Sequence, residues 1–359
     1  MKILHLIPSL DYCGAAAQLG LLSKHLPQSH AMHVCCLGGE GPWAQRLRQQ
    51  GRSVDCLNWT RVCDPTPPWK LHRLLKSLAP DVIHAWGVPA LRALGLIGRR
   101  WLPRTLVSQP LPHRRKQMGP LDRWLLRRVR AVVASSQAEA ALCHEVGVRN
   151  RHLVVVPPGV EVVEFNRKRA DSQNESILCI GALEARKGFR DAIWAFDILH
   201  YVFGDARLLL VGDGPQRADL HRFADGLEMS DHVDFLGWRD DVPELLHDAD
   251  VCWAPTVACT SRQVVLESMA AGCPVVAADR PDLRELILEG QTGFLVPAGD
   301  KVAICKRTRS LFRNPALARQ IGEAARAHVA HHFAPATFAQ RWTDQYAATP
   351  PHPPLAKGG

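Results

Sequence analysis

Short apolar runs alternate with amphipathic stretches along the first half of the chain. The apolar runs have the length and composition of buried strands, and we expect strands at residues 2–9, 33–38, 54–59, 81–86, 104–109, 131–136 and 153–159. The stretches between them space their apolar residues as helices do. After a loop at 11–17 we expect a helix through Leu19, Leu21, Leu22 and Leu26, and further helices at 43–51, 68–78 and 91–101. Strands that alternate with helices predict a parallel sheet.

The same alternation restarts near residue 175. Further strands are expected at 176–183, 206–215, 233–238, 249–255 and 274–279, with a helix at 187–202. The seam at 160–175 is polar and charged. We therefore predict two doubly wound α/β domains, 1–165 and 166–349, with a last helix that can pack back on the first domain. The Pro- and Gly-rich segment 350–359 is expected to be a disordered tail.

Composition narrows the class of protein. The 359 residues exceed one ordinary core, and 47% hydrophobic with 22% charged residues is the balance of a soluble globular protein. Collagen-like, low-complexity and disordered classes are excluded. No apolar run approaches the ~18 residues of a membrane span, and the first residues lack a signal-peptide pattern. The 11 cysteines are scattered without C-x-x-C spacing, which predicts free thiols in a reducing compartment and no zinc site.

Charge is divided unevenly between the two halves. Residues 1–165 hold 22 Lys and Arg against 10 Asp and Glu, a net +12, whereas residues 166–359 hold 22 against 25, a net −3. Ten basic residues lie between Arg99 and Arg130, and residues 119–132 have the pattern of a basic amphipathic helix.

This basic stretch leaves two interpretations open. It is either a solvated face over ordinary core positions or a contact with an anionic membrane surface, made through Arg114, Arg115, Lys116, Arg123, Arg127, Arg128 and Arg130. Nucleic acid is not expected as a partner, because no nucleic-acid-binding motif accompanies the charge.

The segment 251–298 carries the most informative motif, with LESMAAGCPVVAAD at its centre. Six further segments match the same family in the right order, at residues 2–19, 80–87, 154–165, 181–189, 208–215 and 233–251. Together they resemble the family 4 glycosyltransferases, which are retaining enzymes of the GT-B fold. The resemblance implies two Rossmann-like domains facing across a cleft. It also implies transfer of a sugar from a nucleoside-diphosphate sugar to a glycan or lipid-linked acceptor, without cofactor or metal. The expected location is cytoplasmic, with peripheral contact to the inner face of the membrane.

Two residues carry the implied chemistry. Glu267 is expected to accept hydrogen bonds from the ribose hydroxyls of the donor, since a carboxylate can take both vicinal hydroxyls. Lys187 is expected to neutralise the diphosphate as it leaves. Their ordinary alternatives are a helix-start carboxylate favoured by the helix dipole and a solvated surface lysine.

The resemblance also assigns residues of less specific type. The donor-binding set is Gly14, Ala15, Gly212, Gly214, Phe235, Leu236, Arg262, Val265 and Leu266, and the acceptor-side set is His84 and His113. Small residues in a turn before a helix let backbone amides approach phosphates. Each assignment has a plain structural alternative, such as a tight turn for the glycines or core packing for Phe235.

Several positions depart from the family pattern. Cys259 stands where the family has a Glu eight residues before Glu267, and Ala182 stands where it has an Arg five residues before Lys187. Residues 260–264 read Thr-Ser-Arg-Gln-Val in place of Gly-Phe-Gly-Leu-Pro, and Trp86 replaces a His.

These losses leave two hypotheses. The chain is a transferase, or it is a non-catalytic relative that binds a nucleotide, glycan or partner. An NAD-type oxidoreductase is disfavoured because neither half has G-x-G-x-x-G. An epimerase on the same scaffold lacks local support.

Overall fold

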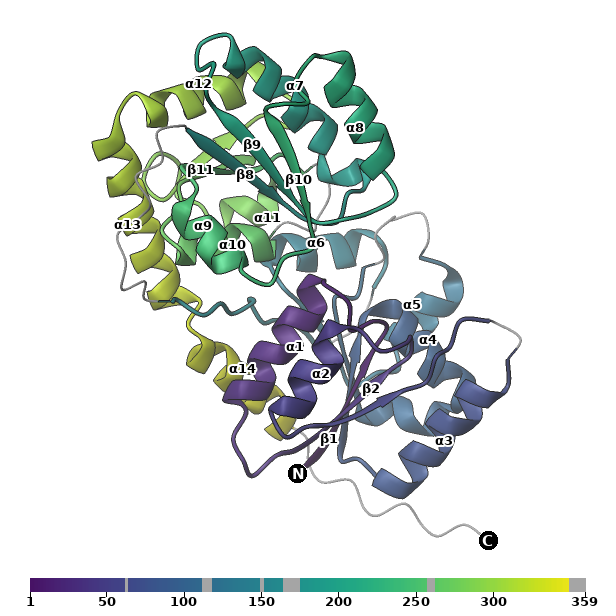
Figure 1. Cartoon of the computed structure of the whole chain (residues 1–359). Helices are drawn as coiled ribbons and strands as arrows, with labels where there is room; N and C mark the ends of the chain where they lie inside the picture. The colour runs from purple at the N-terminus through teal and green to yellow at the C-terminus, as the bar shows by residue number, and fades with distance from the viewer. Residues whose placement is uncertain (62–63, 112–117, 149–151, 164–174, 257–261, 349–359) are drawn as a thin grey trace, which may run out of the picture. The chain divides into compact units, whose positions relative to one another are not determined.

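The computed structural model describes residues 1–61, 64–111, 118–148, 152–163, 175–256 and 262–348 (Figure 1). The chain forms two compact units. Unit 1 is Met1–Gly159 together with Pro335–Gly359, and unit 2 is Val160–Ala334. The sequence placed the domain boundary at residue 165. The structure places it six residues earlier and returns the last helix to the first unit. The expected tail at 350–359 lies outside the described residues.

Unit 1 is built on a seven-stranded parallel sheet in the order β3-β2-β1-β4-β5-β6-β7. Its strands are β1 (Lys2–Ile7), β2 (Ala31–Cys36), β3 (Ser53–Cys56), β4 (Val82–Trp86), β5 (Thr105–Ser108), β6 (Ala131–Ala134) and β7 (Leu153–Val155). Strands β4, β5 and β6 are buried along their whole length. Burial on both faces explains their continuous apolar sequence.

Helices cover this sheet (Figure 1). They are α1 (Gly14–His25), α2 (Pro42–Gln49), α3 (Thr66–Leu78), α4 (Gly87–Ile97), α5 (Pro120–Leu126), α6 (Gln137–Glu145) and α14 (Pro335–Ala347), with a 3₁₀ turn η1 (Arg99–Arg104) after α4. Helix α14 lies against α1, and its Phe338, Trp342 and Tyr346 enter the same core cluster as Ile3 and Leu19. Helix α14, at the end of the described chain, therefore contributes to the same core as β1 and α1 at its beginning.

Unit 2 repeats the plan with a six-stranded parallel sheet in the order β10-β9-β8-β11-β12-β13. Its strands are β8 (Ser176–Ile180), β9 (Arg207–Val211), β10 (Val233–Gly237), β11 (Val251–Ala254), β12 (Val275–Ala278) and β13 (Phe294–Val296). The helices are α7 (Phe189–His200), α8 (Arg217–Gly226), α9 (Val242–Asp248), α10 (Arg262–Ala270), α11 (Pro281–Arg284), α12 (Lys301–Phe312) and α13 (Pro315–His332), with a 3₁₀ turn η3 (Ala185–Lys187). Two Rossmann-like parallel sheets confirm the predicted α/β class.

Helix α5 is shorter than the predicted helix. The sequence predicted a helix over 119–132, but α5 ends at Leu126. The chain then turns so that the Arg130 N–H donates to the Thr105 carbonyl at 2.9 Å, next to the start of strand β6. The backbone after Leu126 pairs with the sheet instead of continuing the helix, although the helical spacing of apolar residues continues to Val129. Strand β13, only three residues long, was not predicted.

Candidate functional site

Two loops at the carboxyl edge of the unit 2 sheet pack closely together. They follow β8 and β9, and the Leu183 N–H donates to the Asp213 carbonyl at 3.0 Å. A Cβ on Gly212 would lie 1.9 Å from the Gly181 oxygen, and one on Gly214 would lie 2.7 Å from the Leu183 backbone. Gly212 also has a φ of +129°, which side chains disfavour. These two predicted donor-binding glycines therefore have a structural reason to be glycine.

Lys187 ends the 3₁₀ turn η3, directly between β8 and α7. Its Nζ lies 3.7 Å from where a Cβ on Gly181 would stand, so the side chain folds over the loop that follows β8. Burial, with a smaller contribution from the charge of Arg186, lowers the pKa of Lys187 to about 8, and the charge of Glu184 opposes this shift. A poorly hydrated cation at a strand end is suited to bind an anion, because less water must be removed.

The neighbouring Arg186 is not placed as a second cation for the same ligand. Its guanidinium donates to the Glu184 carboxylate from the same turn. The expected family Arg is Ala182 in this chain. Among the described residues of this turn, Lys187 is thus the strongest candidate for an anion contact.

Glu267 lies on α10, the helix that follows β11. Its side chain is half-buried, and removal from water raises the pKa of its carboxyl to about 7, while a hydrogen bond from Gln263 lowers it. The Gln263 Nε2 donates to Glu267 Oε1 at 2.6 Å. An exposed carboxylate at a helix start, which was the ordinary alternative, would remain fully hydrated. The environment of Glu267 differs from this.

Three other predicted donor residues on α10 are occupied by the fold. The Arg262 side chain is buried and donates to the Asp282 backbone carbonyl. Val265 and Leu266 are fully buried in the core between α10, β12 and α13. Their side chains therefore pack in the protein, and a contact of Val265 or Leu266 with a ligand would have to use the backbone.

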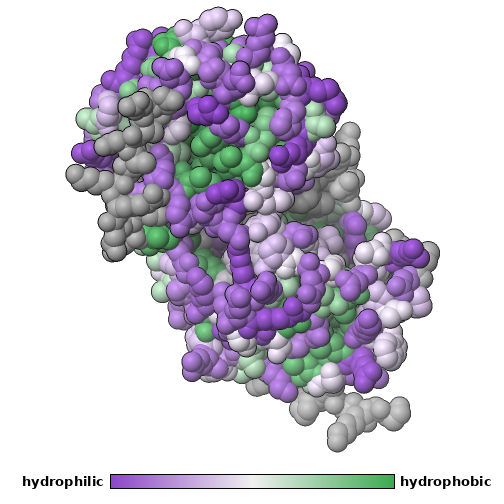
Figure 2. Space-filling view, viewed as in Figure 1, coloured by the Kyte–Doolittle hydropathy of each residue, from purple (hydrophilic) through white to green (hydrophobic). Residues whose placement is uncertain are grey.

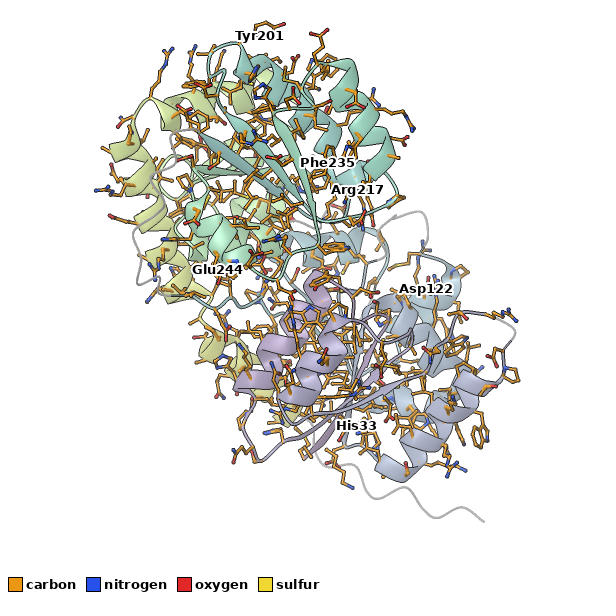
Figure 3. The ribbon with its side chains drawn as sticks, viewed as in Figure 1. His33, Asp122, Tyr201, Arg217, Phe235 and Glu244 are labelled. Carbon is orange, nitrogen blue, oxygen red and sulfur yellow. The ribbon has the colours of Figure 1, made fainter. Side chains whose placement is uncertain are left out.

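Phe235 and Leu236 lie on the edge strand β10. The Phe235 ring stacks on His221 of α8, with ring centroids 3.7 Å apart and an angle of 22° between the ring planes. Arg217 Nη2 donates to the Phe235 carbonyl at 3.3 Å, and Figure 3 shows the two labelled side by side. Leu236 is half-buried and packs against a core cluster that includes Leu178 and Val211. Figure 2 shows an apolar surface over β8–β10. Sequence reasoning missed Arg217 and His221, because α8 alone carries no signal that they meet β10.

Gly14 and Ala15 begin α1 in unit 1, after the loop that follows β1. Gly14 is exposed and Ala15 half-buried. The residue before them, Cys13, has extended backbone and caps the helix without a side-chain hydrogen bond. The first amides of α1 thus stand at the carboxyl edge of the unit 1 sheet, as the sequence predicted.

His84 is placed differently from what an acceptor contact would need. It is fully buried, with Nδ1 2.8 Å from the Tyr346 hydroxyl and Nε2 2.9 Å from Ser108 Oγ. Its ring stacks on Trp86, and burial holds the pKa of His84 well below its usual value. Both ring nitrogens are engaged inside unit 1, so His84 has a structural role there. His113 lies outside the described residues.

The predicted basic stretch is only partly a surface. Arg130 is half-buried, and its guanidinium donates to the Gln345 carbonyl at 2.8 Å near the end of α14. Arg123, Arg127 and Arg128 are exposed. Arg114, Arg115 and Lys116 lie outside the described residues. Arg130 is thus committed to holding α14, which removes it from the predicted membrane contact.

Three further features of the described residues bear on function. Within them, no three His, Cys, Asp or Glu side chains gather so as to hold a metal ion. The nine cysteines that the structure describes are in the thiol form. None of the described helices combines the length and apolar character needed to cross a bilayer.

Comparison with known protein families now decides the class. Residues 12–164 match the family described as Glycosyltransferase Family 4, and residues 174–314 match the one described as Glycosyl transferases group 1. Both halves of the chain therefore match glycosyltransferase families. The matched ranges fall on units 1 and 2.

Two bacterial glycosyltransferases are similar to part of the chain. The N-acetyl-alpha-D-glucosaminyl L-malate synthase of Bacillus anthracis is 33% identical over 175 residues, which are 48% of this chain and 45% of that protein. The phosphatidyl-myo-inositol mannosyltransferase of Mycobacterium leprae is 38% identical over 147 residues, 40% of this chain and 38% of that protein. The chain spans about half or less of the length of these curated relatives.

Among solved structures, HepE of Anabaena in complex with UDP and glucose has a TM-score of 0.86 at 21% identity. The match covers 97% of this chain and 100% of HepE. This likeness, at low identity, confirms the GT-B fold that the resemblance implied.

Proposed function

We propose that this chain is a glycosyltransferase. It transfers a sugar from a nucleoside-diphosphate donor to a hydroxyl of a glycan or lipid-linked acceptor, and it retains the anomeric configuration. The observation that carries the proposal is the pair of glycosyltransferase domains in order along the chain, with Lys187 and Glu267 after strands of the second one. HepE, a structural neighbour, is seen in complex with UDP-glucose, which supports a nucleotide-sugar donor here.

In this proposal the two candidate residues divide the work. Lys187 offers a cation to the diphosphate, whose negative charge grows as the bond to the sugar breaks. Glu267 accepts hydrogen bonds from the ribose and so fixes the nucleotide. The acceptor hydroxyl attacks the anomeric carbon on the face from which the diphosphate leaves, and its proton passes to the departing diphosphate. Attack on this face keeps the configuration.

The test is turnover of a panel of nucleotide sugars, with anomeric configuration read from the product. Lys187→Met and Glu267→Gln should each lower kcat/KM about 10-fold or more, since hydrogen bonds to charged groups contribute about 1.5–3 kcal/mol. Lys306→Met and Glu244→Gln make the same changes at exposed positions and should leave kcat/KM unchanged.

Binding of a nucleoside diphosphate without turnover of any donor would reject the transferase and favour a non-catalytic relative.

We also propose an anionic membrane as the surface that unit 1 meets. Two guanidinium groups lie over the Trp124 ring, Arg99 at 4.8 Å and Arg128 at 3.9 Å from its centroid. Leu96 on α4 is 73% exposed and Leu121 on α5 is 60% exposed. Helices α4 and α5 are joined by the Arg92–Asp122 ion pair at 2.7 Å, which neutralises the one acid of the stretch. Exposed leucines beside arginines suit a lipid surface better than water alone.

Binding to vesicles of phosphatidylglycerol and phosphatidylcholine tests this surface. Replacing Arg123, Arg127 and Arg128 by Glu should abolish binding, whereas the same replacement at Lys306, Arg309 and Arg319 on α12 and α13 should not. The double change Leu96→Ser and Leu121→Ser should weaken binding at fixed charge. Equal binding by all four proteins would exclude the surface.

A further inference from the structure

Glu267 has a polar neighbour one helical turn before it. Gln263 stands where the family pattern has an apolar residue, and its Nε2 donates to Glu267 Oε1 at 2.6 Å. The two side chains are four residues apart on α10, the spacing that brings side chains together on one helix face. The carboxylate is thus held by one oxygen in a defined orientation.

Burial gives this contact more weight than a surface pair would have. Both side chains are half-buried. The carboxylate is poorly hydrated, and Gln263 supplies part of what water would otherwise provide. Burial raises the pKa of Glu267 to about 7, and the hydrogen bond from the Gln263 amide favours the ionised form.

One titratable group faces the same carboxylate from strand β11. Burial raises the pKa of the Cys252 thiol to about 12, a hydrogen bond with Ser268 lowers it, and the charge of Glu267 raises it. The thiol is therefore neutral at working pH and does not hold Glu267 ionised. Among the described residues, Gln263 makes the hydrogen bond that stabilises the charge of this carboxylate.

We propose that Gln263 is a positioning residue, which orients the Glu267 carboxylate for the ribose hydroxyls of the nucleoside diphosphate. This rests on the proposed function. With one carboxylate oxygen held by the amide, the other oxygen and the remaining lone pairs are aimed at the diol. Gln263 thereby replaces, by a different residue type, some of the polar character that the chain lacks at Cys259 and Ala182.

The test compares Gln263→Met, which keeps the side-chain length and removes the donor, with the unchanged protein. UDP, GDP and ADP are the probes, each beside its 2′,3′-dideoxy form, with affinity measured between pH 5.5 and 7.5. For the diphosphate that binds, Gln263→Met should lose about 5- to 10-fold affinity at pH 7. The midpoint of its pH dependence should move upward, because Glu267 now ionises at higher pH. Affinity for the dideoxy form should be equal in the two proteins.

A matched control exists in unit 1. Gln340 on α14 donates to Asp344 at 2.8 Å with the same spacing, but both side chains belong to an exposed pair. Gln340→Met should leave affinity and its pH midpoint unchanged. In a transferase assay, Gln263→Met should raise the donor KM with little change in kcat.

The outcomes separate the two claims. Equal affinity and equal pH midpoint for Gln263→Met would overturn the positioning role and leave the transferase intact. An equal loss with the dideoxy probe would also overturn it, because the effect would not pass through the ribose. Failure of the unchanged protein to bind any of the three diphosphates would reject the proposed function and this inference with it.

Discussion

At the scale of single residues, two ionisable groups of unit 2 have pKa values moved toward neutrality by burial. The pKa of Glu267 is raised to about 7 and that of Lys187 is lowered to about 8. Groups poised in this way are frequent at functional sites. The sequence identified both residues through their motifs, but their burial, and the hydrogen bond from Gln263, came only from the structure.

These two pKa values predict the pH dependence of catalysis. Glu267 must be ionised to accept the ribose hydroxyls, so kcat/KM for the donor should rise as pH passes about 7. Lys187 must be protonated to meet the diphosphate, so kcat/KM should fall as pH passes about 8. The profile of kcat/KM reports the free enzyme.

We therefore expect a narrow bell centred between these values. Lys187→Arg, which stays charged, should abolish the alkaline limb and keep the acid limb. An alkaline limb that persists in this variant would show that another group causes it.

A second prediction at this scale concerns Gly212. A Cβ there would lie 1.9 Å from the Gly181 oxygen on backbone with φ +129°. Gly212→Ala should lower the free energy of unfolding by about 2–4 kcal/mol, through overpacking and backbone strain. Urea unfolding measures it. Gly226 is the last residue of α8, and a Cβ there would have nothing within 4 Å. Gly226→Ala should therefore leave the free energy of unfolding unchanged or raise it slightly. Equal stability of the two variants would contradict the close approach of the loops.

At the scale of elements, α14 is held to unit 1 by polar contacts as well as by apolar packing. Tyr346 bonds to His84, and Arg130 donates to the Gln345 carbonyl near the end of the helix. Phe338 and Trp342 pack in the core of the same unit. The sequence predicted that a last helix can return to the first domain, but its partners lie more than two hundred residues away and leave no local pattern.

Tyr346→Phe removes the hydroxyl and leaves a buried His84 nitrogen without that bond. We expect the free energy of unfolding of unit 1 to fall by about 1–3 kcal/mol. Tyr201→Phe makes the same change on a side chain that is 87% exposed, labelled in Figure 3, and should change stability by less than about 0.5 kcal/mol. Thermal unfolding of both variants gives the comparison. An unchanged melting temperature for Tyr346→Phe would show that the bond to His84 contributes nothing net.

At the scale of the whole molecule, the two units carry different charge and different candidate roles. The candidate donor residues Lys187 and Glu267 lie in the half with net charge −3, so nucleotide phosphates do not account for the +12 of residues 1–165. Part of that positive charge is structural, since Arg92 and Arg130 are engaged with Asp122 and α14. The exposed basic residues of unit 1 carry the positive charge that could meet an anionic partner.

Removal of α14 tests how the chain is divided. A chain that ends at Ala334 keeps all of unit 2. The core of unit 1 then lacks the side chains of Phe338, Trp342 and Tyr346. We expect it to bind a hydrophobic dye and to lose protection from hydrogen exchange in β1 and α1, while β8–β13 stay protected. A chain that ends at Ala348 keeps α14 and should behave as the full chain does. Protection of β1 and α1 in the shorter chain would mean that unit 1 folds without α14.

The sequence by itself determined the alternation of strands and helices, the two parallel sheets and the position of Lys187 and Glu267 in their motifs. These follow from local periodicity and from short motifs, which operate over a few residues. Tertiary structure alone decided that α5 stops at Leu126, that His84 is locked by Tyr346 and Ser108, and that Gln263 holds Glu267. Each depends on burial and on partners brought together by folding, and hydration and hydrogen bonding at a side chain are set by those partners and not by its neighbours in sequence.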